Sequence, residues 1–317
     1  MDKGKKTIDM QAVLIAENFK SDFKQVQAKG PSCLMPCVNV PLLGYTIEFL
    51  IWNDIKRLVI FTCDYAKEVS KFVDEFKAES LSIKVIKTSE VPTVTSVIKD
   101  LDAKDLLTED FLLINSHVVT NINIHEAIKA HNKRKSKDVP MLMTKLFIRC
   151  PLESKLRCRQ DMLSLVSNNN DNQILKYESM VDKKRVKINE FFEFKRSKHS
   201  SLNVRLDLLD CEVDIVNQNI LSVLEEFSNF EEFKDEFINH ITSSEIIVDK
   251  IFMHEVTGVG YFSKITNAQI YFQTCMDTIH NENRLLKSNS LVEYQNLLLE
   301  QTDNINYKGL NEKIGSF

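Results

Sequence analysis

Short apolar segments alternate with helix-forming segments along the first half of this chain, and this alternation limits the folds open to it. The first apolar segment, residues 12–16, leads into a polar loop and then into a proline-containing stretch that ends in a helix at about residues 42–52. The order then repeats, and we predict strands at residues 58–61, 83–86, 111–114 and 141–148 and helices at residues 65–78, 94–101 and 125–133. Such alternation is typical of an α/β fold in which helices cover both faces of a mostly parallel sheet, the doubly wound arrangement.

The second half of the chain has a different texture, with shorter strands. We predict strands at residues 162–166, 186–194, 204–215 and 246–253, and helices at residues 218–227, 233–241 and 267–279. The asparagine-rich run at residues 167–172 predicts a mobile loop. With 317 residues, of which 43% are hydrophobic, the chain is long enough to bury one sizeable core. We therefore expect one main domain with at most a small appendage.

Composition argues against membrane and disulfide-rich proteins. No apolar run reaches the roughly 18 residues that span a bilayer, and the basic residues at the N-terminus are not followed by the apolar core of a signal peptide. The seven cysteines are an odd number, contain no C-x-x-C pair and lie partly within apolar runs. This distribution favours reduced core cysteines over disulfides or a zinc site. We expect a cytoplasmic protein that makes no membrane contact.

The charge of the chain does not indicate a nucleic-acid-binding protein. The net charge is −4, although basic residues cluster at residues 133–137 and 183–187. Such clusters are usually solvated edges of a fold, and the alternative is an electrostatic contact with RNA or with an acidic partner. No motif with interleaved aromatic residues supports an RNA platform, so we expect no direct contact with nucleic acid.

The stretch from residue 31 to residue 41 resembles the motif P-K-P-L-x-P-V-x-x-x-P of the sugar-nucleotide pyrophosphorylases, which belong to the nucleotidyltransferase superfamily. In that superfamily a loop of the type G-G-x-G-T-R-L-x-P-L precedes the motif and binds the nucleotide. Here the paired glycines are replaced by Glu17 and Asn18, the arginine by Asp22 and the motif lysine by Ser32. Glycines let backbone N–H groups approach a triphosphate, and the basic residues neutralise its charge. Acidic residues repel a phosphate instead, and at an effective dielectric constant of about 20 a like charge at 4 Å costs about 4 kcal/mol. The resemblance therefore implies a nucleotidyltransferase fold whose nucleotide site is degenerate.

The predicted metal position also departs from the superfamily. In active members the corresponding fourth strand ends in a glycine-aspartate pair, and the aspartate holds the catalytic Mg²⁺, whereas here the strand is followed by Ser116 and His117. Mg²⁺ prefers hard oxygen ligands, and histidine does not replace a carboxylate. Asp207, Asp210 and Asp214 resemble a metal cluster, but the odd spacing of the first two places them on opposite faces of a strand. We interpret these aspartates as structural and expect no metal and no other cofactor.

Several further segments resemble one particular branch of this superfamily. They are residues 11–14, 45–50, 110–114, 121–124 and 207–211. Together they resemble the N-terminal half of the epsilon subunits of translation initiation factor 2B, the eukaryotic guanine-nucleotide exchange factor that recharges initiation factor 2. The resemblance extends in register from about residue 11 to residue 279.

This resemblance implies a division of the chain and a role for it. Residues 1–283 would form a degenerate nucleotidyltransferase-like domain, and residues 284–317 a helical linker and the first turn of a truncated left-handed β-helix. Members of the family continue into a C-terminal helical-repeat domain that carries the exchange activity. The chain would then be a scaffold and partner-binding domain without transferase activity, and its partners would be the gamma subunit, the other subunits of the exchange factor and initiation factor 2. The alternatives are a noncatalytic regulatory subunit of a sugar-nucleotide pyrophosphorylase and an active sugar nucleotidyltransferase.

Overall fold

A computed structural model describes most of the chain from Met10 to His280. The described residues are 10–16, 30–76, 78, 80–107, 109–151, 153–158, 161, 163–180, 201–226, 236–244, 247–258 and 260–280. The predicted linker and β-helix at residues 284–317, the predicted strand at residues 186–194 and the basic cluster at residues 183–187 lie outside these residues. In the described part, no helix is both long enough and apolar enough to cross a bilayer.

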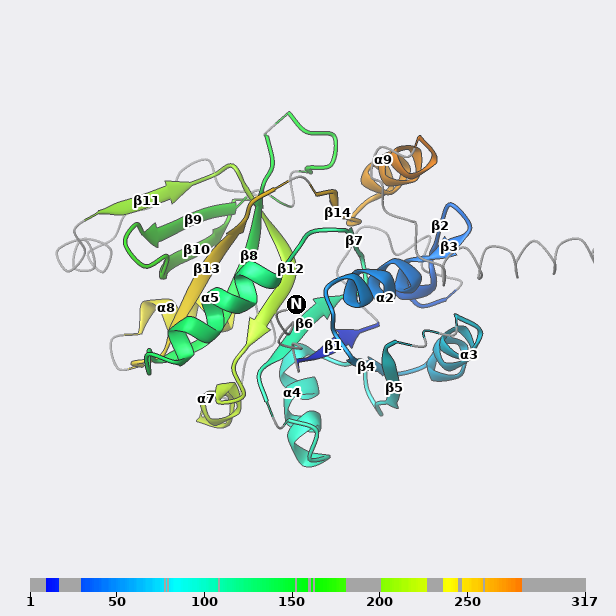
Figure 1. The fold of residues 1–317 in the computed structure, drawn as a ribbon, viewed down its shortest axis with the longest axis horizontal. Coiled ribbons are helices and arrows are strands. Elements are labelled where there is room, and N and C mark those ends of the chain that lie inside the picture. Colours follow the sequence, from blue (N-terminus) through cyan, green and yellow to red (C-terminus); the bar gives the residue numbers. More distant parts are fainter. Residues whose placement is uncertain are drawn as a thin grey trace, which may run out of the picture.

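A seven-stranded sheet forms the centre of the fold, with strand order β13-β8-β12-β6-β1-β4-β5 (Figure 1). Its strands are β1 (Gln11–Ile15), β4 (Arg57–Thr62), β5 (Ser82–Lys87), β6 (Phe111–Asn115), β8 (Met141–Arg149), β12 (Leu208–Val216) and β13 (Lys250–Val256). β12 is antiparallel to both of its neighbours, β6 and β8, whereas every other pair in the sheet is parallel. The mostly parallel α/β sheet expected from the sequence is therefore confirmed.

Both faces of this sheet are buried, as a doubly wound fold requires. Along β1, Ala12 and Leu14 enter the core on one face, while Val13 and Ile15 enter the core on the other. The first face is covered by α2 (Leu42–Trp52), α3 (Ala66–Phe76) and α5 (His125–Lys135), together with the 3₁₀ helix η1 (Ser32–Leu34). The helix α9 (Ala268–Ile279) packs farther out, against β2 (Pro36–Cys37) and β14 (Phe262–Lys264) (Figure 1). The second face is covered by α4 (Val94–Ala103), α7 (Ile220–Glu226) and α8 (Ile238–Ser243). Strands buried on two faces read as continuous apolar runs, and for this reason they were recognisable in the sequence.

The helix α2 is the best-buried helix of the first face, and it has the bounds predicted from the sequence. All of its residues from Leu42 to Leu50 are buried, which explains why the segment is apolar on nearly every side. Gly44 permits its close approach to neighbouring elements, because a Cβ at this position would lie 2.8 Å from Val40 Cγ1 and 3.2 Å from Phe76 Cε2. The helix therefore packs closely against β3 (Val40–Pro41) and α3.

Three smaller sheets complete the described fold. A three-stranded antiparallel sheet has the order β10-β9-β11 and packs against the second face of the main sheet, at the far end of the molecule from α3 (Figure 1). Two-stranded sheets join β14 to β7 and β2 to β3. The strands are β2 (Pro36–Cys37), β3 (Val40–Pro41), β7 (Val118–Thr120), β9 (Leu163–Asn168), β10 (Ile174–Ser179), β11 (Leu202–Arg205) and β14 (Phe262–Lys264).

Three predicted elements of the second half were wrong in detail. The loop predicted at residues 167–172 is shorter, because Ser167 and Asn168 are buried and pair with strands on both sides of β9. The strand predicted at residues 204–215 is two strands, since the chain leaves the small sheet after Arg205 and enters the main sheet at Leu208. The strand predicted at residues 246–253 begins later, at Lys250, where its pairing with β8 starts.

All seven cysteines are free, and five of them are buried. This agrees with the prediction of reduced core cysteines. Cys37 Sγ lies 3.6 Å from Cys275 Sγ, which brings β2 and α9 together. Burial raises the pKa of the Cys37 thiol to about 12, so this group is held as a neutral thiol.

Candidate functional site

Two of the predicted site positions, Ser32 and His117, lie near each other at the carboxyl ends of β1 and β6. In open α/β sheets this edge is the usual place for ligands. Ser32 Oγ donates a hydrogen bond to the carbonyl oxygen of Ala16, at 3.1 Å, and lies 3.3 Å from Ser116 Oγ. Ser32 is buried, so its hydroxyl group serves to join η1 to the ends of the two strands. The remaining predicted positions, Glu17, Asn18 and Asp22, lie outside the described residues.

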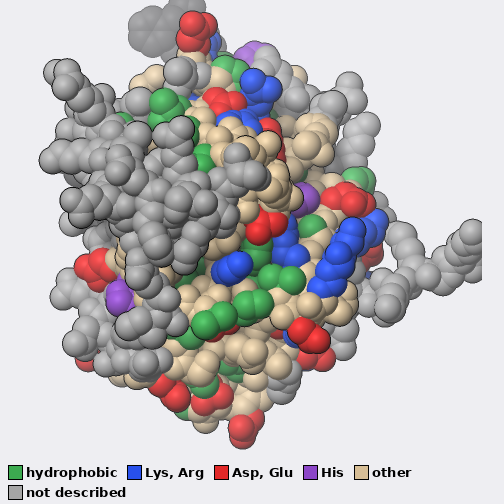
Figure 2. Space-filling view, turned by 90° about the vertical axis from the view of Figure 1, so that its left-hand side faces the viewer, with side chains coloured by type: hydrophobic (Ala, Val, Ile, Leu, Met, Phe, Trp, Pro, Cys, Tyr) green, Lys and Arg blue, Asp and Glu red, His purple; other side chains and the backbone are tan. Residues whose placement is uncertain are grey.

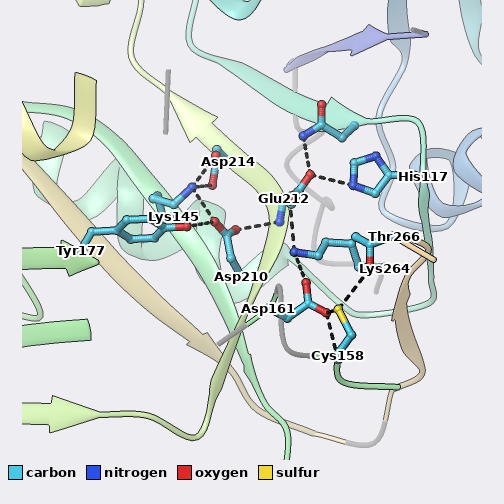
Figure 3. Close-up of polar contacts among 11 residues, drawn as sticks. His117, Lys145, Cys158, Asp161, Tyr177, Asp210, Glu212, Asp214, Lys264 and Thr266 are labelled. Atoms are coloured by element: carbon cyan, nitrogen blue, oxygen red, sulfur yellow. Dashed lines mark hydrogen bonds and ion pairs between the residues drawn. The ribbon is translucent and has the colours of Figure 1, made fainter. Parts of the chain in front are cut away.

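His117 forms the second part of the site through Glu212, a residue that the sequence did not single out. His117 Nε2 lies 2.9 Å from Glu212 Oε2 (Figure 3). Asn115 Nδ2 donates a hydrogen bond of 2.6 Å to the same oxygen. Both side chains are largely buried, with 12% of His117 and 8% of Glu212 exposed. His117, which the sequence predicts as the counterpart of a Mg²⁺-binding aspartate, is thus paired with a carboxylate of the protein itself.

A β-bulge in β12 brings Glu212 to this place. The register between β12 and β8 shifts between Asp210 and Asp214, and Glu212 has a positive φ of 53°. The backbone N–H of Glu212 donates a 2.9 Å hydrogen bond to Asp210 Oδ1, which stabilises the bulge. Bulges commonly redirect a side chain in this way, and here the redirected carboxylate meets His117.

A buried lysine extends the cluster on the other side of Glu212. Lys264 Nζ in β14 lies 3.5 Å from Glu212 Oε1 and 2.5 Å from Asp161 Oδ1. Cys158 Sγ donates to the second oxygen of Asp161 at 2.9 Å and lies 3.4 Å from Thr266 Oγ1 (Figure 3). Burial by itself lowers the pKa of Lys264, but Glu212 and Asp161 raise it above its usual value, so the ammonium group stays charged.

A second buried lysine, Lys145 in the middle of β8, joins two of the aspartates that resembled a metal cluster. Its Nζ lies 2.8 Å from Asp214 Oδ2 and 3.2 Å from Asp210 Oδ2, and the side chain is fully buried. Tyr177 donates its hydroxyl proton to Asp210 Oδ2 at 2.9 Å. Burial by itself lowers the pKa of Lys145, whereas the two carboxylates raise it above its usual value. Asp207 stands apart and binds Arg205 in a two-pronged ion pair.

The combined electrostatics of this cluster disfavour a nucleotide. Asp161, Asp210, Glu212 and Asp214 supply four carboxylates, while Lys145 and Lys264 supply two ammonium groups, so the carboxylates outnumber the ammonium groups by two. A phosphate would be repelled by this excess, and the lysines already contact carboxylates.

The donor set of this cluster does not fit the catalytic Mg²⁺ ion either. At the end of β6 one carboxylate, Glu212, already contacts His117, Asn115 and Lys264. Among the described residues, no group of three or more carboxylate, histidine or cysteine side chains could hold a metal ion. The geometry is that of a satisfied internal network, which can orient β6, β12 and β14 relative to one another.

One signal in the sequence pointed to part of this network. Lys145 interrupts an otherwise apolar strand, and a charged residue at a doubly buried position requires an oppositely charged partner. Nothing in the sequence identified Glu212, Lys264 or Asp161, because their partners come from distant segments.

Comparison with known structures places the fold in the class indicated by the sequence. No family model matches the chain. An apo UDP-glucose pyrophosphorylase superimposes with a TM-score of 0.59 at 11% identity, covering 87% of this chain and 100% of the other. A putative glucose-1-phosphate thymidylyltransferase from Bacillus anthracis gives a TM-score of 0.58 at 12% identity, covering 85% and 94%. The chain has the nucleotidyltransferase fold of the sugar-nucleotide pyrophosphorylases.

Curated relatives give the more particular likeness. The epsilon subunit of translation initiation factor eIF2B from Dictyostelium discoideum is 27% identical over 284 residues, which cover 88% of this chain and 40% of that protein. The subunit of the same name from Schizosaccharomyces pombe is 26% identical over 274 residues, covering 85% and 40%. The chain therefore contains an eIF2B epsilon-like nucleotidyltransferase domain, and it spans about 40% of the length of these relatives.

Proposed function

We propose that this chain acts in translation initiation as the nucleotidyltransferase-like domain of an exchange-factor epsilon subunit, where it serves as a scaffold that binds partner subunits in the cytoplasm. The proposed partners are the gamma subunit, the other subunits of the exchange factor and initiation factor 2. The likeness to two epsilon subunits over at least 85% of the chain supports this role. We further propose that the domain has no transferase activity of its own.

The observation that carries the proposed loss of activity is the contact of His117 with Glu212. A catalytic Mg²⁺ ion needs an open set of oxygen ligands, whereas Glu212 Oε2 contacts His117 Nε2 at 2.9 Å and Asn115 Nδ2 at 2.6 Å. Freeing this carboxylate would break its contacts with His117, Asn115 and Lys264, and a hydrogen bond to a charged group typically contributes about 1.5–3 kcal/mol. The network thus opposes metal binding.

A ligand-binding experiment tests this loss. The melting temperature would be measured with Mg²⁺ and each of the common nucleoside triphosphates and nucleotide sugars, with an active pyrophosphorylase as the positive control. A ligand present at 100 times its dissociation constant stabilises a fold by about 2.7 kcal/mol, which is easily detected. We expect no Mg²⁺-dependent shift for this chain. A Mg²⁺-dependent shift with any of these ligands would support the active-transferase alternative and refute the proposal.

A co-expression experiment tests the scaffold role. The chain would be co-expressed separately with a gamma subunit and with a catalytic sugar-nucleotide pyrophosphorylase subunit, and each pair would be purified through a tag on the partner. We expect a stable pair with gamma alone. Co-purification with the pyrophosphorylase subunit instead would favour the noncatalytic regulatory-subunit alternative.

An exchange experiment tests whether this region carries the activity. Initiation factor 2 loaded with fluorescent GDP would be mixed with excess chain, and the release of GDP followed by fluorescence. We expect the spontaneous rate, because the family resemblance implies that exchange belongs to a C-terminal domain. Acceleration by tenfold, which is equivalent to about 1.4 kcal/mol off the barrier, would contradict this division of roles.

A further inference from the structure

A partly enclosed cavity lies at the C-terminal end of α5, next to the starts of β8 and β13. Its volume is about 380 Å³, and it is lined by Ala130, Lys133, Arg134, Lys137, Val139, Asp171 and Phe252. Three of these residues belong to the basic cluster at residues 133–137. The face drawn in Figure 2, which is the left-hand side of Figure 1, shows Lys and Arg side chains gathered beside hydrophobic ones. This cavity lies near the amino-terminal ends of β8 and β13, whereas the contact of His117 with Glu212 lies at the carboxyl end of β6.

Arg134 is the most constrained basic side chain of the cavity. Its guanidinium carbon lies 4.5 Å from the centre of the Phe252 ring, and Nη2 donates a long hydrogen bond of 3.4 Å to the carbonyl oxygen of Asp171. Nη1 is buried and has no hydrogen-bond partner. Burial lowers the pKa of Arg134, while Asp171 opposes that effect. The guanidinium group is therefore held in place with its positive charge only partly compensated.

The charges around the cavity do not balance. Lys133, Arg134 and Lys137 carry three positive charges against the single carboxylate of Asp171, a local net charge of +2 in a chain whose net charge is −4. The carboxylate of Asp171 also accepts a 3.0 Å hydrogen bond from the backbone N–H of Gln173. Basic residues are common at helix C-termini because they interact with the helix dipole. That interaction does not explain the cavity or the unpartnered nitrogen of Arg134.

We propose that this cavity binds a phosphate monoester. A phosphate monoester carries about two negative charges at neutral pH, which matches the local charge of +2. Arginine and lysine are the side chains that recognise phosphate, arginine through its planar fork and lysine as a point charge. The volume lies within the range of about 300–1,000 Å³ typical of small-molecule sites. Ala130, Val139 and Phe252 give the cavity an apolar floor that suits the organic body of the ligand.

Isothermal titration calorimetry on the full chain tests the proposal. The probes are adenosine 5′-monophosphate, inorganic phosphate and a phosphoserine peptide, and adenosine and the unphosphorylated peptide are the matched ligands without phosphate. We expect saturable binding of at least one phosphate monoester and none of its phosphate-free counterpart. Tighter binding of the nucleotide indicates a free metabolite as the ligand, and tighter binding of the peptide indicates a phosphorylated side chain. Both results support a phosphate monoester site.

Charge-removing variants locate the binding. In the variant K133Q/K137Q we expect about tenfold weaker binding, because two cations next to the phosphate are lost. The control K129Q removes an exposed lysine of the same helix that is paired with Glu126 at 2.7 Å, and it should leave the affinity unchanged. Melting curves without ligand confirm that each variant is folded. The proposal is overturned if no phosphate monoester binds, if the phosphate-free ligands bind equally well, or if K133Q/K137Q binds as tightly as K129Q.

Discussion

Replacement of the buried Lys145 by methionine tests the network that joins β8 to β12. Methionine has a similar length and fits an apolar strand, so the main loss is the cation between Asp210 and Asp214, which are only 5% and 4% exposed. Removing one partner of a buried ion pair typically costs about 3–5 kcal/mol, because the remaining charge stays buried and uncompensated. In a domain of this size, 1 kcal/mol shifts the melting temperature by about 2–4 °C. We therefore expect K145M to lower the melting temperature by about 6–20 °C.

Urea unfolding at neutral pH, followed by far-UV circular dichroism, measures this loss. Circular dichroism is the better probe because the single tryptophan, Trp52, is 69% exposed and reports poorly on the core. The matched control is K104M, which breaks the ion pair with Asp100, in which both side chains are about two-fifths exposed, and should cost at most about 1 kcal/mol. The triple variant K145M/D210N/D214N should recover part of the stability, since it removes the buried charges. A loss below about 1 kcal/mol in K145M would refute the reasoning.

Three further changes test the core, the pH dependence and the candidate site. Burial by itself raises the pKa of Asp110, but His131 and Lys135 lower it to about 2. The ionised carboxylate therefore contributes roughly 2 kcal/mol to the free energy of unfolding above its unfolded pKa of about 4. This contribution is lost as the pH falls toward 2. The difference in unfolding free energy between wild type and D110N should shrink over this range, and a constant difference would exclude Asp110 as its source. G44A should destabilise the fold by about 1–3 kcal/mol although alanine favours helices, because the added methyl group would lie 2.8 Å from the Val40 side chain in β3. Thermal unfolding measures this loss, and an unchanged melting temperature would show that the packing around Gly44 is loose. S32K introduces the lysine of the pyrophosphorylase motif. It should unfold at a lower temperature than S32A, because the serine hydroxyl fills a buried position between two strand ends. It should also bind no UTP in calorimetry. UTP binding by S32K would show that the site is open.

Local patterns in the sequence predicted most of the main sheet and its helices. Strands such as β1 and β4 are buried on both faces, and they appear as continuous apolar runs with little ambiguity. The helix α2 is apolar along its whole length and preceded by a proline, so both of its bounds were predicted correctly. Prediction was poorer for the strands after residue 160, because those strands change partners within a few residues and local composition does not reveal where pairing begins.

The candidate site was only partly predictable. Ser32 and His117 were found because they replace residues of a recognisable motif, and the structure places both at the same edge of the sheet. Glu212 was missed because its importance depends on the bulge in β12, which forms where the registers of β12 and β8 do not match. A register mismatch is a property of two paired strands and has no signature in either one alone.

The sequence by itself determined the alternation of strands and helices, the burial of both sheet faces and the kinds of residue at the candidate site. These features are set by side chains within a few positions of one another, through hydrophobic periodicity and local chemistry. Only the tertiary structure decided which charges meet, because Asn115 and Glu212 are 97 residues apart and Lys145 and Asp214 are 69 residues apart. Their pairing follows from the place of β12 between β6 and β8, antiparallel to both, and that strand order is fixed by the packing of the whole sheet.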